Sequence, residues 1–197
     1  MISTSSTHPF VTLSNMNQLT HTQLSPFDWG LFILTFIALI ALKLMHQQAS
    51  VDDLQFLLQP VVQALSWSRP DIFTYLPGVG FVNANQSVII DKGCSGLNFW
   101  VIACALGIFT VIPSMLSIRL KILAYLGLWV LAWAVTLLAN TARINIALWY
   151  QQHSLPQPMM SPAGLHEAIG VVSYVVFLIL YYVFLVYSIR QKPSCPA

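Results

Sequence analysis

The rest of the chain is organised around the stretch Asp91–Trp100, which reads DKGCSGLNFW. It joins a β-like run at 87–90 to a charge-free apolar helix. The spacing predicts that Cys94 begins this helix, where unpaired N–H groups and the helix dipole favour a thiolate over a thiol. Lys92 adds a nearby positive charge. The alternative is that Cys94 is a small apolar residue at a helix start.

The composition is that of an integral membrane protein. The 197 residues are 57% hydrophobic and only 7% charged, whereas a soluble domain carries roughly 25% charged residues. A net charge of +2 without basic runs argues against a nucleic-acid partner. The three cysteines, Cys94, Cys104 and Cys195, have no Cys-x-x-Cys spacing, so we expect no disulfide framework, no metal site and no cofactor.

Four apolar segments are long enough to cross a bilayer core. They are expected from about Phe27 to Met45, from near Cys94 to Pro113, from Ile122 to Ala139 with a helical continuation to Tyr150, and from about Glu167 to Tyr187. Residues 1–26 are polar and contain no Lys or Arg, which predicts a flexible tail before a retained first span rather than a cleaved signal peptide. We therefore expect one transmembrane bundle domain over 27–192, followed by a short tail at 193–197.

The segments between the spans predict three further features. Leu54–Trp67 is apolar but interrupted by glutamines and Pro60, which favours an interfacial or re-entrant helix. Residues 70–80 are turn-rich, and Phe81-Val82 can pair with Ser87–Ile90 as a short hairpin. Residues 151–164, with three prolines and a glycine, predict a loop. The predicted fold class is thus all-α, a polytopic membrane helical bundle with about four transmembrane helices plus an interfacial or re-entrant helix.

The chemically capable residues of the spans are expected at one membrane face. Cys94 lies at the start of the second span, Arg143 at the end of the third and His166 at the start of the fourth. Lys121 and Arg143 are separated by about 22 residues, or roughly 33 Å of helix, which is one bilayer core. Because successive spans run antiparallel, Cys94, Arg143 and His166 share a side.

Each of these residues also has a structural explanation. Arg143 at a helix end can snorkel to the interface. However, Asn140 and Asn145 flank it on an otherwise apolar helix, and polar groups at membrane depth are functional candidates by default. His166 can be a helix-start residue, with Glu167 favouring the same end of the dipole.

Three sequence blocks resemble the exosortase/archaeosortase family. They are Gly93-Cys94-Ser95-Gly96-Leu97 for its Cys-Ser-Gly block, Asn140-Thr-Ala-Arg143-Ile144 for its Asn-x-x-Arg-Ile block, and His166-Glu167-Ala168-Ile169-Gly170 for its His-containing block. The match covers roughly residues 91–174 and suits a compact member, such as the exosortase K type. The resemblance implies a membrane-bound cysteine protease and transpeptidase. Such enzymes cut a C-terminal sorting signal from surface proteins and can join the new terminus to a membrane or cell-surface acceptor.

The residue types suit acyl transfer through a thioester. A Cys94 thiolate attacks the scissile carbonyl, and His166 protonates the leaving amine. The Arg143 guanidinium donates hydrogen bonds to the developing oxyanion. We expect Asn140 or Asn145 to orient Arg143.

Other functions remain open at this point. Ser95 is an alternative nucleophile, although no Gly-x-Ser-x-Gly elbow surrounds it. A metalloprotease built on His166 and Glu167 lacks its second histidine, because residue 170 is glycine. In the non-enzymatic alternative, a small membrane subunit or transporter accessory protein pairs Arg143 with an acidic residue of a partner inside the bilayer.

The basic residues near the span ends divide equally between the two faces. Arg119, Lys121, Arg190 and Lys192 lie opposite the cysteine, and Lys43, Arg69, Lys92 and Arg143 lie on its own side. With Lys92 and Arg143 set aside as site residues, the positive-inside rule favours an extracytoplasmic Cys94. We expect a multi-pass protein of the cell inner or plasma membrane, whose partners are the lipid bilayer and exported proteins with a C-terminal sorting signal.

Overall fold

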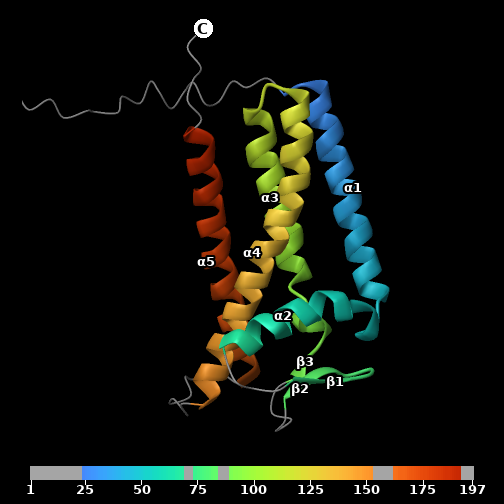
Figure 1. Ribbon diagram of the computed structural model, residues 1–197, viewed down its shortest axis with the longest axis vertical. Helices are drawn as coiled ribbons and strands as arrows, with labels where there is room; N and C mark the ends of the chain where they lie inside the picture. The colour runs from blue at the N-terminus through green and yellow to red at the C-terminus, as the bar shows by residue number, and fades with distance from the viewer. Residues whose placement is uncertain (1–23, 69–72, 84–88, 153–161, 192–197) are drawn as a thin grey trace, which may run out of the picture.

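Four long helices form a bundle in the computed structural model (Figure 1), which describes residues 24–68, 73–83, 89–152 and 162–191. They are α1 (Pro26–Gln48), α3 (Leu97–Val111), α4 (Ile118–Gln152) and α5 (Pro162–Arg190). By length and composition, four segments of the described chain are able to cross a membrane. This confirms the predicted all-α membrane bundle. The tails predicted at 1–26 and 193–197 lie almost entirely outside the described residues.

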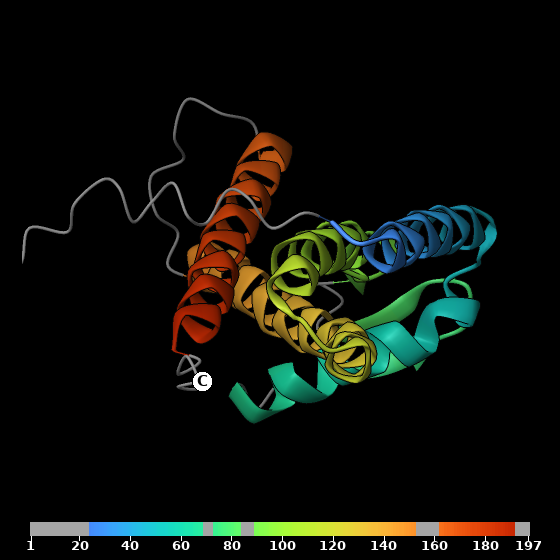
Figure 2. The ribbon, with the colours of Figure 1, turned by 90° about the horizontal axis from the view of Figure 1, so that it is seen from above.

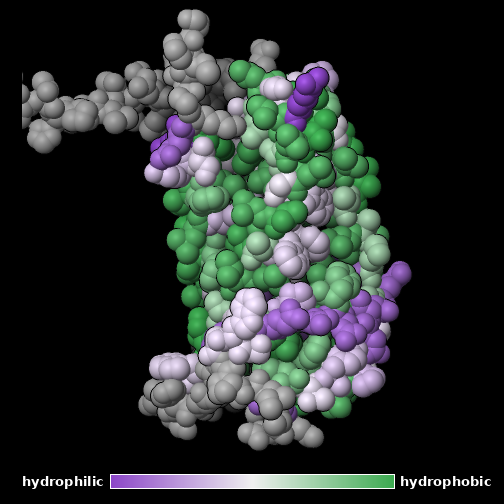
Figure 3. Space-filling view, viewed as in Figure 1, coloured by the Kyte–Doolittle hydropathy of each residue, from purple (hydrophilic) through white to green (hydrophobic). Residues whose placement is uncertain are grey.

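The hydrophobic core of the bundle is built around α3. Phe99, Ala103, Cys104 and Ile108 are at most 3% exposed and pack against α1, α4 and α5. The view along the bundle in Figure 2 shows α3 between α1 and α4. Cys104 is therefore a packing residue of this core. Apolar side chains that face outward cover the middle of the bundle, and hydrophilic ones gather toward its two ends (Figure 3).

α4 is one uninterrupted helix of 35 residues. At 1.5 Å per residue it is about 52 Å long, which exceeds a bilayer core of roughly 30 Å. Its C-terminal part therefore continues beyond the membrane-spanning length and packs against α2 (Gln55–Ser68). The loop predicted at 151–164 is shorter at both ends, because α4 extends to Gln152 and α5 begins at Pro162; residues 153–161 lie outside the description.

A buried ion pair joins α1 to the start of α4. Ser25 and Asp28 form a capping box at the N-terminus of α1. The Asp28 carboxylate also pairs with Lys121, and both side chains are at most 7% exposed. The third span was expected to begin at Ile122, but α4 already begins at Ile118, and its first turn buries this lysine.

α2 lies across the end of the bundle, as Figure 1 shows, and is too short to span a membrane. Its Leu58, Val61 and Leu65 are at most 1% exposed and pack against the α4 side chains Ile144 and Leu148. This agrees with the interfacial or re-entrant helix predicted over Leu54–Trp67.

A three-stranded antiparallel sheet lies beside α2, in the order β1 (Phe73–Leu76), β2 (Gly80–Asn83) and β3 (Ile89–Ile90). Its β2–β3 pair confirms the predicted hairpin, with Phe81 opposite Ile90. β1 was not predicted, because the turn residues that follow it dominate the local pattern. A side chain on Gly80, which has φ +116°, would collide with the Ile90 carbonyl oxygen, so glycine permits this close approach.

The Asp52 carboxylate holds the turn between β1 and β2. It accepts a hydrogen bond from the Gly78 N–H, at 2.9 Å, and another from the Tyr75 hydroxyl. These two bonds lower the pKa of Asp52, and the bond to Asp52 raises the pKa of Tyr75 to about 12. The sheet is thereby fixed to the segment that follows α1, and β3 leads directly into the Cys94 turn.

Candidate active site

Cys94 ends a short 3₁₀ turn, η4 (Lys92–Cys94), which connects β3 to α3. The Asp91 carboxylate caps this turn by accepting from the Gly93 N–H at 2.9 Å, and the Cys94 N–H donates to the Asp91 carbonyl oxygen, also at 2.9 Å. α3 begins only at Leu97. The prediction that Cys94 begins this helix is therefore wrong by one short turn. The unpaired N–H groups at the start of α3 come after Cys94 in the chain, so Cys94 is not itself the first residue of the helix.

Gly96 allows the Cys94 turn to lie directly on α4. Its φ of +69° is in the left-handed region, which favours glycine. A Cβ atom there would also lie 2.9 Å from the Thr136 methyl carbon of α4. The glycine after Cys-Ser is thus needed both for its backbone conformation and for the closeness of the two elements.

Asn140 of α4 is 0% exposed and connects three elements. Its side-chain Nδ2 donates to the carbonyl oxygen of Cys94, and its Oδ1 accepts from the Tyr174 hydroxyl of α5 at 3.2 Å. Tyr174 in turn lies beside the Arg143 guanidinium, whose carbon is 5.4 Å from the ring centroid. Asn140 therefore contacts Tyr174, which itself lies beside Arg143, and the orienting role expected for Asn140 stays a prediction.

Arg143 reaches from α4 to the candidate nucleophile. Its Nη2 donates to Cys94 Sγ at 3.4 Å. Gly170 of α5 leaves room for this side chain, since a Cβ atom there would lie 3.4 Å from Arg143 Cδ. The buried Arg143 Nε has no hydrogen-bond partner among the described residues, so the guanidinium retains a donor for a further acceptor.

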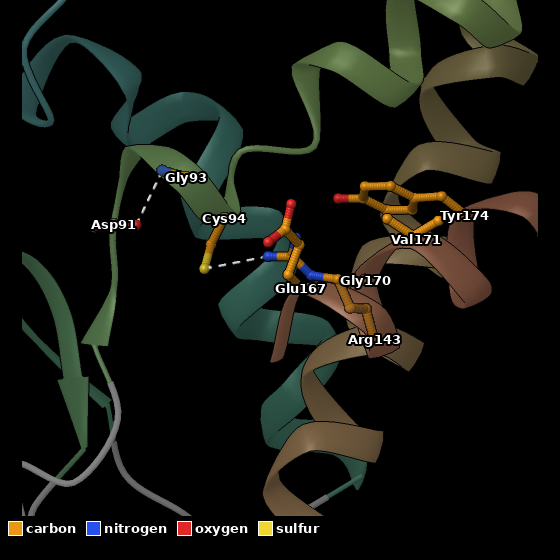
Figure 4. A pocket seen from close by; sticks show the side chains of 8 residues that line it. All are labelled: Asp91, Gly93, Cys94, Arg143, Glu167, Gly170, Val171 and Tyr174. Atoms are coloured by element: carbon orange, nitrogen blue, oxygen red, sulfur yellow. Dashed lines mark hydrogen bonds between the residues drawn. The ribbon is translucent and has the colours of Figure 1, made fainter. Parts of the chain in front are cut away.

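The Cys94–Arg143 contact forms part of the wall of a pocket of about 370 Å³. The lining residues come from the Cys94 turn, α4 and α5: Asp91, Gly93, Cys94, Arg143, Glu167, Gly170, Val171 and Tyr174. Figure 4 shows the Cys94 sulfur and the Arg143 guanidinium pointing toward each other, with Glu167 beside them. The pocket thus combines a thiol, a cationic hydrogen-bond donor and two exposed acidic residues, Asp91 and Glu167.

His166 lies in the first turns of α5, at the end of the bundle that carries the pocket. It precedes Gly170 by four residues, so these two positions share one face of the helix. The side chain of His166 lies outside the described part of the chain. The backbone thus brings residue 166 to the same region as Cys94 and Arg143.

Two of the predicted supporting residues stabilise neighbouring elements instead. The Lys92 ammonium donates to the carbonyl oxygens of Gln47 and Ala49, at 3.0 and 2.8 Å, at the C-terminal end of α1. Asn145 bonds through Nδ2 to the Ser68 hydroxyl at 3.1 Å, which ties α4 to the end of α2. The structure therefore places these polar groups around the site rather than on the Cys94 thiol.

Ser95 is only 7% exposed and does not contribute to the pocket lining. Its hydroxyl lies 3.0 Å from Nε2 of His46, in the last turn of α1. A serine next to a histidine suits nucleophilic catalysis, but this serine is buried away from the pocket, whereas Cys94 lines it. Of these two residues, only Cys94 is placed to meet a molecule in the pocket.

Sequence reasoning missed three residues near the site: His46, Glu167 as a pocket residue, and Tyr174. A signal existed for two of them, because Glu167, Gly170 and Tyr174 recur at the spacing of one helix face. His46 carries no such signal, since it reaches Ser95 from a helix 49 positions away in the chain.

Within the described ranges, no group of three or more His, Cys, Asp and Glu side chains is arranged to hold a metal ion. Comparison of the chain with protein-family models, with curated proteins and with solved structures found no match.

Proposed function

We propose that this protein is a membrane-embedded cysteine peptidase and transpeptidase that cleaves a C-terminal sorting signal from exported proteins. One observation carries the proposal: the Arg143 guanidinium lies 3.4 Å from the Cys94 sulfur in the wall of a pocket of about 370 Å³. A carbonyl group attacked by this sulfur would have a cationic donor within reach. The sequence resemblance to exosortases and archaeosortases supplies the substrate class.

The reaction follows from these groups. The Cys94 thiolate forms a C–S bond with the scissile carbonyl carbon, and the resulting oxyanion accepts hydrogen bonds from the N–H groups of Arg143. His166 donates a proton as the C–N bond breaks, which releases the C-terminal piece and leaves a thioester. Water or an amine acceptor then attacks the thioester and returns the thiol. A positioned oxyanion donor lowers such a barrier by roughly 3–4 kcal/mol.

The non-enzymatic alternative requires Arg143 to pair with an acidic residue of another chain. Arg143 instead contacts Cys94 and Tyr174 of its own chain and lines a pocket. This arrangement supports the enzymatic proposal, because the guanidinium lies beside a thiol of its own chain in the wall of a pocket.

The decisive experiment is to co-express this protein with a surface protein encoded in the same genome. The surface protein chosen should end in a short motif, one apolar helix and a basic cluster. Cys94→Ala, Arg143→Ala and His166→Ala should each nearly abolish its processing while the protein accumulates in the membrane. Cys104→Ala is the matched control, since Cys104 is a core residue with 0% exposure, and it should process normally. Processing at the wild-type rate by Cys94→Ala would end the proposal.

The proposed orientation places the Cys94 pocket on the extracytoplasmic side, because exported proteins are available only there. Asp28 neutralises Lys121, one of the four basic residues counted on the opposite face. The positive-inside rule therefore supports this orientation less strongly than the need for exported substrates does. A phosphatase fused after Ala197 should be inactive, and one inserted near Asn85 should be active. The reverse pattern would place Cys94 in the cytoplasm and contradict this function.

A further inference from the structure

Four hydrogen bonds fasten the C-terminal end of α1 to the Cys94 turn and the start of α3. Lys43 Nζ donates to the side-chain oxygen of Asn98, and Lys92 Nζ donates to carbonyl oxygens at the end of α1. Between them, His46 Nε2 lies 3.0 Å from Ser95 Oγ. We name these five residues, Lys43, His46, Lys92, Ser95 and Asn98, the α1 clasp. Ser95, one of its members, directly follows Cys94 in the chain.

Ser95 links the clasp to the turn that contains Cys94. Its backbone N–H donates to the Lys92 carbonyl oxygen at 3.1 Å, which closes the turn that contains Cys94. Its hydroxyl oxygen lies 3.5 Å from the Leu97 N–H and accepts from it, at the first residue of α3. One lone pair is thus used by Leu97, and the hydroxyl proton is left to donate to an unprotonated His46 Nε2.

We propose that His46 is a positioning residue for Cys94: its neutral ring accepts the Ser95 hydroxyl proton and thereby keeps the Cys94 thiol against Arg143. This role rests on the proposed function, in which the contact between thiol and guanidinium prepares the nucleophile. His46 itself touches neither the pocket nor a substrate.

Protonation of His46 would weaken this arrangement. The charged side chains that face it are Lys43, on its own helix, and Lys92, on the Cys94 turn. A protonated ring would add a third positive charge, and its Nε2 would no longer accept a hydrogen bond. The one ion pair found among the described residues lies at the other end of α1. Cys94 reactivity should therefore fall as His46 becomes protonated.

The test measures alkylation of Cys94 by iodoacetamide in the full-length protein in lipid nanodiscs. The modified peptide is quantified by mass spectrometry between about pH 5 and 9, the range in which histidines and thiols titrate. His46→Ala should slow alkylation about tenfold near neutral pH and move the profile about one unit upward, because the thiolate loses its contact with Arg143. His46→Gln should restore the rate, since its amide oxygen accepts the Ser95 hydroxyl.

The shape of the profile separates positioning from packing. Wild type should show two ionisations, and His46→Gln only that of the thiol. Met45→Ala, on the neighbouring and 69% exposed position, is the matched control and should behave as wild type. A merely structural His46 would, when replaced by Ala, raise the rate at every pH without moving the profile, and that result would overturn the proposal.

Two further outcomes would also overturn it: an unchanged rate and profile in His46→Ala, or a His46→Gln variant that behaves like His46→Ala. Failure of the wild-type protein to cleave any substrate would instead contradict the peptidase function, because alkylation requires no substrate.

Discussion

Asn140 donates a hydrogen bond to the main-chain carbonyl oxygen of Cys94, so the position of the candidate nucleophile is set by a side chain of α4. The other end of the same amide accepts the Tyr174 hydroxyl at 3.2 Å. One buried side chain thus joins the Cys94 turn, α4 and α5. The elements that form the pocket are coupled at this point.

Asn140→Ala should reduce substrate processing at least tenfold and destabilise the fold by about 1–3 kcal/mol. The reason is that the Cys94 carbonyl and the Tyr174 hydroxyl both lose their partner in a buried place. Thermal unfolding in detergent and a processing assay measure the two effects. Tyr174→Phe, which removes one bond and keeps the ring, should lose less. Wild-type processing by Asn140→Ala would show that the amide is dispensable.

Gly96→Ala should destabilise the protein by about 1–3 kcal/mol, through an unfavourable φ of +69° and the 2.9 Å approach to the Thr136 methyl carbon. Gly127→Ala is the control, since a Cβ atom at Gly127 of α4 has nothing within 4 Å. Adding Thr136→Ser, which deletes the obstructing methyl group, should recover part of the loss. No recovery in the double variant would mean that the backbone conformation alone matters.

Arg143→Lys should remain impaired by about 10²–10³-fold in processing. Lysine keeps the charge, but it loses the planar set of donors that can serve the sulfur and an oxyanion together. Measuring kcat and KM separately checks the cause, because loss of transition-state stabilisation lowers kcat. A lysine variant with full kcat would show that only the charge is needed.

Asp28→Asn should destabilise the protein by about 3–5 kcal/mol, because it leaves the Lys121 ammonium buried without its counter-ion. Asp28→Leu combined with Lys121→Met should lose only about 1 kcal/mol, from the capping box with Ser25, since both buried charges are then removed. Unfolding followed by tryptophan fluorescence distinguishes the two. A double variant as unstable as Asp28→Asn would mean that the pair contributes net stability.

Tyr75 should ionise near pH 12, because its hydroxyl donates to Asp52. The raised pKa means that this bond stabilises the sheet fully below the ordinary tyrosine pKa of about 10. The contribution is lost as pH rises through about 12. Ultraviolet titration of wild type against Tyr75→Phe isolates this group, and in Asp52→Asn its pKa should return toward 10. An unchanged pKa in Asp52→Asn would refute the bond.

The sequence alone determined the membrane class, the four spans and the short helix between the first two spans. Each of these depends on the length and hydrophobicity of a continuous segment, which are local quantities. The antiparallel alternation of the spans also placed Cys94 and Arg143 on one side, and the structure brings them to 3.4 Å. The β2–β3 hairpin was predicted for the same reason, since its alternation and turn are local.

Only the tertiary structure decided which polar group meets which. Lys121 was placed just before the third span and is buried against Asp28. Lys92 was expected near the thiol and contacts α1, and His46 contacts Ser95. Such pairings depend on the rotation of each helix about its axis and on its depth relative to its neighbours. These are set by the packing of whole helix faces, and a helix pattern read in isolation does not contain them.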